Sequence, residues 1–525
     1  MKQSQGVATL HLNGTNFESD LSKADLLASQ FATTYAKAAD GGAPLPTKLP
    51  PHYQDAGLSI SEYEIYQQLL RLGSKENVTA DGIPQVFLKE FAIFLSEPLY
   101  MIFARSYADS TVPTLMKYGI VTPIFKKGTK SDPSNYRPVT QCSIVCSVFE
   151  KIISRHITMH LTINGLLDSR QHGFTRNRST CTQLLHMTQD WAVFRNNNVP
   201  YHCIYFDQKS AFDRVPHDRL LAKLSSLGLN RQIVNWCQAF LQDRHFSVRI
   251  NNAMSSPRPA PSGVPQGSCI APTLYSLFLL DLNSYLPEGI EYLIFADDLK
   301  IYSPIRSNDS KELLQDAING VVRWCDANAM TLSIGKCLVL KSNSDDHQYY
   351  IDSRSLPEVE HVRDLGVTLS ARLDFGLHCL NTSKSCFSTV NSLFRAFIVR
   401  RPDFYIALYR SLVVPKIEYC SPVWRPHLKK HLRLLESVRS RFLRRLRWRC
   451  GQSCDNLQTI TELFDTADLR TYRYLEKHGL IDHFITVVPN SLRSRFGYRP
   501  KQTAKTERIN NQFAWRICRQ MQRRR

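Results

Sequence analysis

The stretch Tyr292-Leu293-Ile294-Phe295-Ala296-Asp297-Asp298-Leu299-Lys300-Ile301-Tyr302 decides the fold of this chain. Two apolar and aromatic runs flank a pair of acids, which predicts a β-hairpin with both carboxylates at its tip. Acids that follow strands are often ordinary turn residues. Consecutive acids, however, repel each other unless a cation lies between them. We therefore expect Asp297 and Asp298 to be metal ligands.

A second strand is expected at residues 202–206, and it leads directly into Asp207. Three carboxylates at strand ends suit a two-metal phosphoryl-transfer site, because Mg²⁺ ions about 4 Å apart need hard anionic oxygen ligands. Helical patterns surround these strands, which predicts a mixed α and β protein with an antiparallel sheet. The expected helices cover residues 84–101, 144–157, 219–227, 231–241, 272–282 and 311–329.

Composition narrows the functional class. The chain has 525 residues, enough for several packed units, and its 66 Lys and Arg against 46 Asp and Glu give a net charge of +20. This surplus predicts a polyanionic partner, nucleic acid before membrane. The 14 cysteines are scattered, which favours reduced thiols in an intracellular compartment, nucleus or cytoplasm. The sequence lacks a signal segment and an apolar stretch of about 18 residues, so no membrane association is expected.

The motifs resemble those of reverse transcriptases from non-LTR (LINE-type) retrotransposons. Residues 295–298 resemble the aromatic-x-Asp-Asp box of reverse transcriptases, and residues 206–215 resemble the first-aspartate motif of this branch. Between them, Gly263-Val264-Pro265-Gln266-Gly267-Ser268 is similar to the loop that precedes the template-contacting helix. The order of the motifs is that of the family, which makes coincidence remote.

The resemblance extends over about residues 60–450. Residues 123–128 with 135–139 resemble the first fingers motif, and residues 171–175 with 179–180 resemble the second. Farther along, other segments resemble the lysine-bearing segment, the primer grip and the helical thumb. They are residues 324–336, 365–367, 419–424 and 435–438.

The resemblance implies an α+β right-hand polymerase with fingers, a palm that carries an antiparallel sheet, and a helical thumb. Residues 1–58 are expected to form an N-terminal extension, a helix followed by a loose connector. The expected domains are fingers at 59–200, palm at 201–375, thumb at 376–450 and a basic C-terminal helical region at 451–525. The short N-terminal extension leaves no room for an endonuclease, so DNA nicking is not expected.

The resemblance also assigns catalytic roles. Asp207 and Asp297 would bind two Mg²⁺ ions, with Mn²⁺ as a possible substitute, and Asp298 would support the primer terminus. Lys336 matches the lysine proposed to protonate the departing pyrophosphate. Phe212 matches the aromatic residue that lies under the sugar and excludes a 2′-hydroxyl. The alternative for Phe212 is a packed core aromatic.

Further residues are expected to bind the nucleotide or the nucleic acid. Gln266 lies in a Pro- and Gly-containing loop that would approach the incoming nucleotide, although a plain turn uses the same residues. Lys127 and Arg137 match fingers residues that bind the triphosphate, or they are solvated surface. A basic helix face with an interleaved aromatic, Trp448, would follow a phosphate backbone, or is merely solvated. Its arginines are Arg441, Arg444 and Arg445.

The sequence therefore predicts an RNA-directed DNA polymerase that uses an RNA template, a DNA primer and deoxynucleoside triphosphates. Two alternatives remain open: a catalytically silent RNA-binding or maturase-like protein with the same fold, and an RNA-templated RNA polymerase. A zinc site is also considered near the end of the chain, but the long gap between its two pairs fits common zinc motifs poorly. Its residues would be Cys450, Cys454, His478 and His483.

Overall fold

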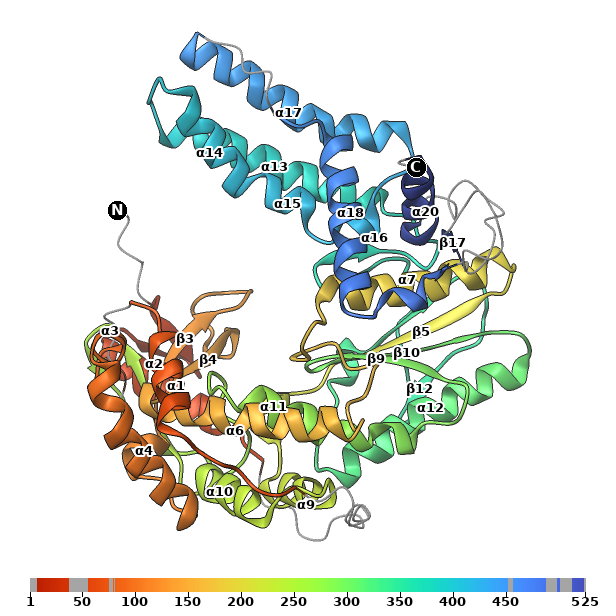
Figure 1. Cartoon of the computed structure of the whole chain (residues 1–525). Coiled ribbons are helices and arrows are strands. Elements are labelled where there is room, and N and C mark those ends of the chain that lie inside the picture. Colours follow the sequence, from red (N-terminus) through yellow and green to blue (C-terminus); the bar gives the residue numbers. More distant parts are fainter. Residues whose placement is uncertain are drawn as a thin grey trace. The chain divides into compact units, whose positions relative to one another are not determined.

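The computed structural model describes residues 7–36, 55–74, 79, 81–451, 457–487, 498–500 and 512–523. The chain divides into two units, each built from several segments. Unit one consists of Met1–Phe174, Asp207–Leu286 and Asn319–Ser333. Unit two consists of Thr175–Phe206, Pro287–Ile318 and Ile334–Arg525. Figure 1 shows the elements of both units along the chain.

Unit one contains a five-stranded mixed sheet in the order β4-β3-β6-β7, with β8 also paired to β6. Strand β3 runs antiparallel to β4 and parallel to β6. The strands are β3 (Tyr118–Phe125), β4 (Tyr136–Gln141), β6 (His245–Ile250), β7 (Ala253–Met254) and β8 (Arg258–Pro259). This sheet carries the residues of the first fingers motif on β3 and β4.

An N-terminal segment packs on that sheet. It consists of β1 (Leu10–Leu12), β2 (Thr15–Phe17) and α1 (Asp20–Ala32). Helix α1 contacts β6, β7 and β8, and Leu27 and Phe31 share a core with Val248. The helix predicted within residues 1–58 is therefore α1, whereas the predicted connector falls largely on residues 37–54, outside the described residues.

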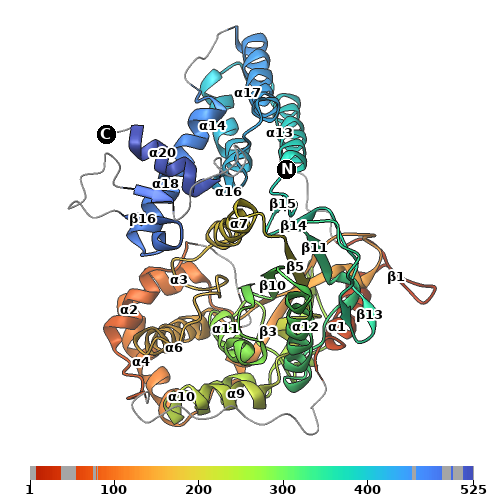
Figure 2. The same ribbon diagram turned by 90° about the vertical axis from the view of Figure 1, so that its right-hand side faces the viewer.

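Helices complete unit one. Serine side chains cap two of them, since Ser61 accepts from the backbone of Glu64 at α2 and Ser143 accepts from that of Cys146 at α6. Helix α11 packs on α6 and α9, and α10 packs on α9 (Figure 2). The elements are α2 (Glu62–Leu70), α3 (Gln85–Glu90), α4 (Ala92–Ala108), α5 (Thr114–Lys117), η2 (Pro133–Asn135), α6 (Ile144–Ile163), α8 (Ala211–Arg214), α9 (His217–Ser226), α10 (Arg231–Leu241), α11 (Ala271–Phe278) and η3 (Leu280–Tyr285).

Unit two is built on a four-stranded sheet in the order β11-β5-β10-β9, in which every neighbouring pair is antiparallel. The strands are β5 (Tyr201–Phe206), β9 (Glu291–Phe295), β10 (Asp298–Pro304) and β11 (Leu338–Lys341). Strand β5 is buried nearly throughout, as expected for a central strand. Helix α7 (Thr180–Asn196) packs near β9 and begins at a capping box formed by Ser179 and Thr182.

The same unit holds short hairpins and a helical region. Helices α13, α14 and α17 lie side by side (Figure 1). Their apolar faces share a core with β5 and α7. The elements are η4 (Ile334–Lys336), β12 (Tyr350–Ile351), β13 (Arg354–Ser355), β14 (Val362–Asp364), β15 (Val367–Leu369), α13 (Gly376–Ala396), α14 (Pro402–Leu412), α15 (Val414–Glu418), α16 (Ser421–Trp424), α17 (Lys429–Cys450), α18 (Ile460–Lys477), η5 (Ile481–His483), β16 (Ile485–Val487), β17 (Tyr498–Pro500) and α20 (Phe513–Arg523).

The structure confirms the predicted α+β class, the antiparallel sheet and the hairpin of residues 292–302. The predicted helix at 84–101 is instead two helices, α3 and α4, because Phe91 between them leaves helical geometry. Helix α12 (Asn308–Ala327) is continuous, although the division between the units falls within it. Among the described helices, none is long and apolar enough to cross a membrane.

Candidate catalytic site

The hairpin of β9 and β10 has a two-residue turn. Phe295 pairs with Asp298, which leaves Ala296 and Asp297 as the turn itself. Ala296 has a φ of 56° and is buried, although a left-handed conformation costs a non-glycine residue roughly 1–2 kcal/mol. Both acids are exposed. The turn therefore exposes two adjacent carboxylates, while the strained backbone of Ala296 beside them is buried.

The carboxyl end of β5 lies at the same edge of the sheet as this turn. Phe206, the last residue of β5, pairs with Leu299, which follows Asp298 in β10. The next residue along the chain is Asp207, joined to Phe206 by a peptide bond. The strand register thus brings the end of β5 next to the start of β10.

Lys336 precedes β11, the strand that pairs with β5 on the side opposite to β10. It ends η4, is exposed, and comes two residues before Leu338, which pairs with Tyr205. Because β11 runs antiparallel to β5, the start of β11 lies at the edge of the sheet where β5 ends. The sheet therefore places Lys336 at the edge that carries the Asp297-Asp298 turn.

The segment that begins at Asp207 is fixed within unit one. The backbone N–H of Ser333 donates to the Asp207 carbonyl at 2.7 Å, and that of Lys209 donates to the Thr331 carbonyl at 2.8 Å. Gln208 forms a bridge with Leu332 between these two bonds. The first-aspartate motif is thereby tied to the segment that precedes Lys336.

Phe212 is half-buried and stacks on a second ring. Its ring lies 4.4 Å from that of Tyr275 at an interplanar angle of 17°, and the edge of Phe174 approaches it at 6.0 Å. Tyr275 is itself buried, and its hydroxyl donates to Gln208 at 3.0 Å. Phe212 therefore has one supported face and is not a fully buried core residue.

The loop of residues 263–268 packs tightly against backbone. Gly263 has a φ of 82°, and a Cβ there would come within 2.6 Å of the Phe212 carbonyl oxygen. A Cβ at Gly267, whose φ is 124°, would overlap the carbonyl oxygen of Thr140. The amide of Thr140 also donates to the Gln266 carbonyl at 2.9 Å. Only glycine suits the two positions, so the loop is held between the first-aspartate motif and β4.

The side chain of Gln266 binds a buried acid that the sequence did not single out. Its Nε2 donates to Oδ1 of Asp213 at 2.8 Å, and Thr34 lies 3.5 Å from Oδ2. Burial raises the pKa of Asp213 to about 6, while the hydrogen bonds from Gln266 and Thr34 and the charge of Arg137 lower it. Gln266 and Arg137 therefore lie near one carboxylate.

Lys127 and Arg137 belong to the hairpin of β3 and β4. Lys127 is exposed in the connecting loop, and Arg137 is exposed on β4, where it pairs with Ile124. Gly128 has a φ of 91° and contacts Asn135, whose carbonyl accepts from the backbone of Lys126 at 2.8 Å. The hairpin thus presents both cationic side chains to solvent.

A buried ion pair supports the sheet of unit two. Nζ of Lys300 on β10 contacts Oδ2 of Asp364 on β14, and both side chains are almost fully buried. The hydroxyl of Tyr205 donates to the same oxygen at 3.3 Å. The following turn at Leu365 is held by Tyr419, whose hydroxyl donates to the Leu365 carbonyl at 2.8 Å. The segment that resembles a primer grip is therefore attached to the sheet and to the helical region.

The basic helix α17 lines a cavity of about 700 Å³ with α13. The cavity is lined by Asn391, Phe394, Arg395, Arg444, Arg445, Trp448 and Arg449. Trp448 is 82% exposed. Arg441 instead lies over the ring of Phe387 at 5.4 Å. Three of the four residues of the predicted basic face therefore line this cavity: Arg444, Arg445 and Trp448. Arg441 contacts Phe387 instead.

Comparison with known proteins agrees with the motifs. Residues 124–369 match the family described as Reverse transcriptase (RNA-dependent DNA polymerase). The chain is 27% identical over 435 residues to "Probable RNA-directed DNA polymerase from transposon BS" of Drosophila melanogaster, with 79% of this chain and 47% of that protein covered. It is 25% identical over 419 residues to "RNA-directed DNA polymerase from mobile element jockey" of the same species, with 76% and 45% covered. The chain spans about half the length of these curated relatives.

A truncated apo telomerase from Candida tropicalis is similar over 53% of this chain and 58% of that chain, at 13% identity and a TM-score of 0.35. The similarity to reverse transcriptases therefore comes from the sequence matches. Residues 124–369 of this chain match the reverse transcriptase family, and the chain is similar to RNA-directed DNA polymerases of non-LTR retrotransposons.

Proposed function

We propose that the chain is an RNA-directed DNA polymerase that extends a DNA primer on an RNA template with deoxynucleoside triphosphates. The observation that carries the proposal is the register of the four-stranded sheet. Phe206 pairs with Leu299, so the strand that leads into Asp207 ends where the Asp297-Asp298 turn begins. Three carboxylates would then converge on one edge.

This donor set fits a pair of hard divalent cations, because carboxylate oxygens are the ligands that Mg²⁺ and Mn²⁺ prefer. Asp207 and Asp297 would hold both ions, and Asp298 would support the primer terminus. Bound there, the ions would activate the primer 3′-hydroxyl and neutralise the departing pyrophosphate. Lys336, at the same edge of the sheet, would donate a proton to the leaving group.

Residues of unit one would select and hold the nucleotide. Phe212 would lie under the sugar, supported from behind by Tyr275. Arg137 and Lys127 are exposed cations that would bind phosphate oxygens, the first as a planar fork and the second as a point charge. Gln266 would act by holding its loop against Asp213. Deoxynucleotide selection would then depend on a ring supported by packing.

The cavity between α13 and α17 would bind the nucleic-acid backbone. Arg444 and Arg445 line it together with the exposed ring of Trp448. Arginines that neutralise phosphates and a ring on which a base stacks are the two components of sequence-tolerant binding to single strands. Arg441 would contribute charge from beside Phe387.

A primer-extension assay tests the proposal. The purified chain, an RNA template, a DNA primer, deoxynucleoside triphosphates and Mg²⁺ should give templated extension that EDTA abolishes. Asp297→Asn should lower the rate by about 10²- to 10³-fold, because a group that stabilises transition-state charge typically contributes this much. Asp352→Asn, an exposed acid in the turn between β12 and β13, is the matched control and should extend normally.

The outcomes separate the alternatives. Equal extension by Asp297→Asn and the unchanged chain would remove the metal assignment. If neither chain extends but both bind RNA, the silent RNA-binding function is supported instead. Incorporation of ribonucleotides in preference to deoxynucleotides would support an RNA polymerase.

A further inference from the structure

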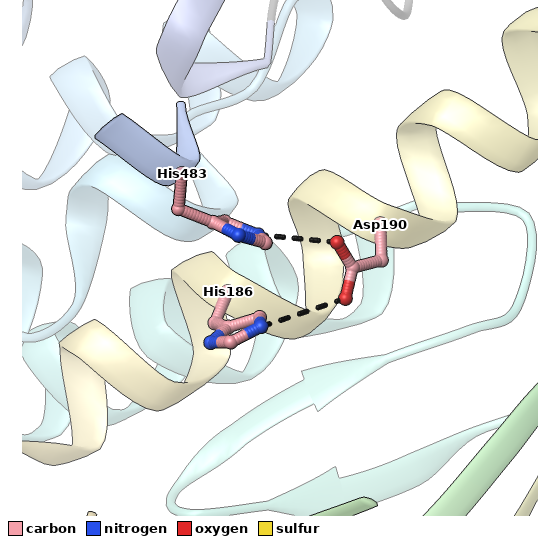
Figure 3. A group of neighbouring side chains, drawn as sticks. All are labelled: His186, Asp190 and His483. Carbon is pink, nitrogen blue, oxygen red and sulfur yellow. Dashed lines mark ion pairs between the residues drawn. The ribbon is translucent and has the colours of Figure 1, made fainter. Parts of the chain in front are cut away.

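Three potential metal ligands meet in unit two, away from the proposed catalytic residues. His186 and Asp190 lie one turn apart on α7, so their side chains share one face of the helix. His483 comes from η5, far along the chain (Figure 3). One ligand atom from each residue lies within 4.8 Å of those of the other two. Within the described residues, this is the only such group of three His, Cys, Asp or Glu side chains.

The carboxylate of Asp190 lies between the two imidazoles. Its Oδ1 is 3.1 Å from Nε2 of His483, and its Oδ2 is 3.8 Å from Nε2 of His186. The two rings are 3.9 Å apart between centroids. In a tetrahedral site with bonds of 2.0–2.2 Å, neighbouring ligand atoms are roughly 3.3–3.6 Å apart. The two N···O separations, one to each carboxylate oxygen, lie just below and just above that range.

One ring nitrogen of this group is buried without a hydrogen bond in the part of the chain that the structure describes. Nε2 of His483 is inaccessible to solvent and makes no hydrogen bond within the described residues, although Asp190 is near enough. The Asp190 carboxylate already accepts a hydrogen bond from the hydroxyl of Tyr302 at 2.6 Å.

We propose that His186, Asp190 and His483 form a binding site for a zinc-type transition-metal ion. Imidazole nitrogens favour Zn²⁺ over Mg²⁺, and one carboxylate oxygen completes a common set of three protein ligands. The fourth position would be taken by water. The hydroxyl of Tyr302 would orient the carboxylate, as groups hydrogen-bonded to metal ligands do.

The site connects two segments that are distant in the sequence, α7 and η5, and both pack in one core. Met187 and Trp191 of α7 are buried in the same core as Ile481 and Phe484, which flank His483. The backbone positions of the ligands are therefore fixed by packing on both sides. The proposed ion would attach η5 to α7 and would stabilise the folded chain over the unfolded one.

This site differs from the zinc set considered from the sequence. His483 takes part, but His478 lies against the ring of Tyr474 at the end of α18. Cys454 lies outside the described residues. The sequence prediction lacks His186 and Asp190, which lie one turn apart on α7.

Metal content tests the proposal directly. The purified full chain is saturated with Zn²⁺, dialysed against metal-free buffer and measured by elemental mass spectrometry, with an expected ratio of one zinc per chain. His186→Gln, Asp190→Asn and His483→Gln should each lower zinc affinity by more than 100-fold. Tyr302→Phe should lower it by about 10- to 100-fold, the usual effect of removing a group that orients a ligand. His478→Gln and Cys450→Ser are matched controls.

A thermal readout separates metal binding from simple packing. The melting temperature of the unchanged chain should rise on adding Zn²⁺ and fall with EDTA, and this difference should vanish in His483→Gln while persisting in His478→Gln. Equal zinc content in His483→Gln and the unchanged chain would overturn the proposal. So would zinc that is lost with Cys450→Ser but retained by His186→Gln, or a melting temperature indifferent to zinc.

Discussion

Nε2 of Gln266 donates a 2.8 Å hydrogen bond to Oδ1 of Asp213, which connects the loop of residues 263–268 to the helix that carries Phe212. The acid is 7% exposed, and burial raises its pKa from 3.8 to about 6. The neutral form of Asp213 is therefore favoured in the folded chain relative to the unfolded one. The burial of Asp213 therefore makes a pH-dependent contribution to stability.

We expect Asp213 to destabilise the fold as pH rises. The native state binds the proton of the Asp213 carboxyl group more tightly than the unfolded state does. The stabilisation that this proton gives is therefore fully present below pH 3.8 and is lost as pH rises through about 6. The free energy of unfolding, relative to Asp213→Asn, should fall by about 3 kcal/mol over this range. Urea unfolding of both chains at several pH values measures it. Parallel stability profiles would contradict the pKa shift.

Replacing Phe212 should change sugar selection. Phe212→Ala removes the ring that Tyr275 supports, so the ratio of kcat/KM for deoxynucleotides over ribonucleotides should fall by about 10- to 100-fold. Single-nucleotide incorporation measures the ratio. Phe212→Tyr keeps the ring and should keep the preference. An unchanged ratio in Phe212→Ala would leave Phe212 as a packing residue only.

The cavity between α13 and α17 should control salt-dependent binding. Arg444→Ala removes one phosphate contact, so the slope of log affinity for single-stranded RNA against log salt should become shallower by about 0.7. Trp448→Ala should cost about 1–3 kcal/mol of binding free energy at every salt concentration, because stacking is lost. Fluorescence anisotropy measures both. Arg401→Ala, on an exposed arginine outside the cavity, should change neither quantity.

Breaking the Lys300–Asp364 pair should strongly destabilise unit two. Lys300→Met leaves a buried carboxylate without its cation and should cost about 3–5 kcal/mol of unfolding free energy. The double variant Lys300→Met/Asp364→Leu should recover most of that loss, because both charges are removed. Denaturant unfolding measures each variant. Arg401→Met, which breaks an exposed pair with Asp403, should have little effect. Equal losses in the single and double variants would mean that packing, and not charge, stabilises this position.

Local patterns predicted much of the sheet and its turn. Residues 202–206 and 292–302 alternate little in polarity because both faces of their strands are covered, and the acids mark the strand ends. The helix at 231–241 matches α10 at both ends, and the side chain of Asn230 caps its start. These features depend on neighbours in the sequence, which is why a single chain reveals them.

Contacts between distant segments could not be predicted in this way. Asp213 binds Gln266, and Lys300 binds Asp364, only because the fold buries both acids beside those partners. The fold likewise brings His483 within 3.1 Å of Asp190, a residue far from it in the sequence. No periodicity connects such pairs. The spacing of His186 and Asp190 was visible, but one pair on a helix does not identify a site without its third member.

Ala296 has a further consequence for the turn between β9 and β10. A glycine would adopt its left-handed backbone without strain, but it would also visit many other conformations. The buried methyl group removes most of that freedom. On the proposed function, the hairpin carries a strain of roughly 1–2 kcal/mol, and its restricted backbone would return Asp297 to the same position after each translocation.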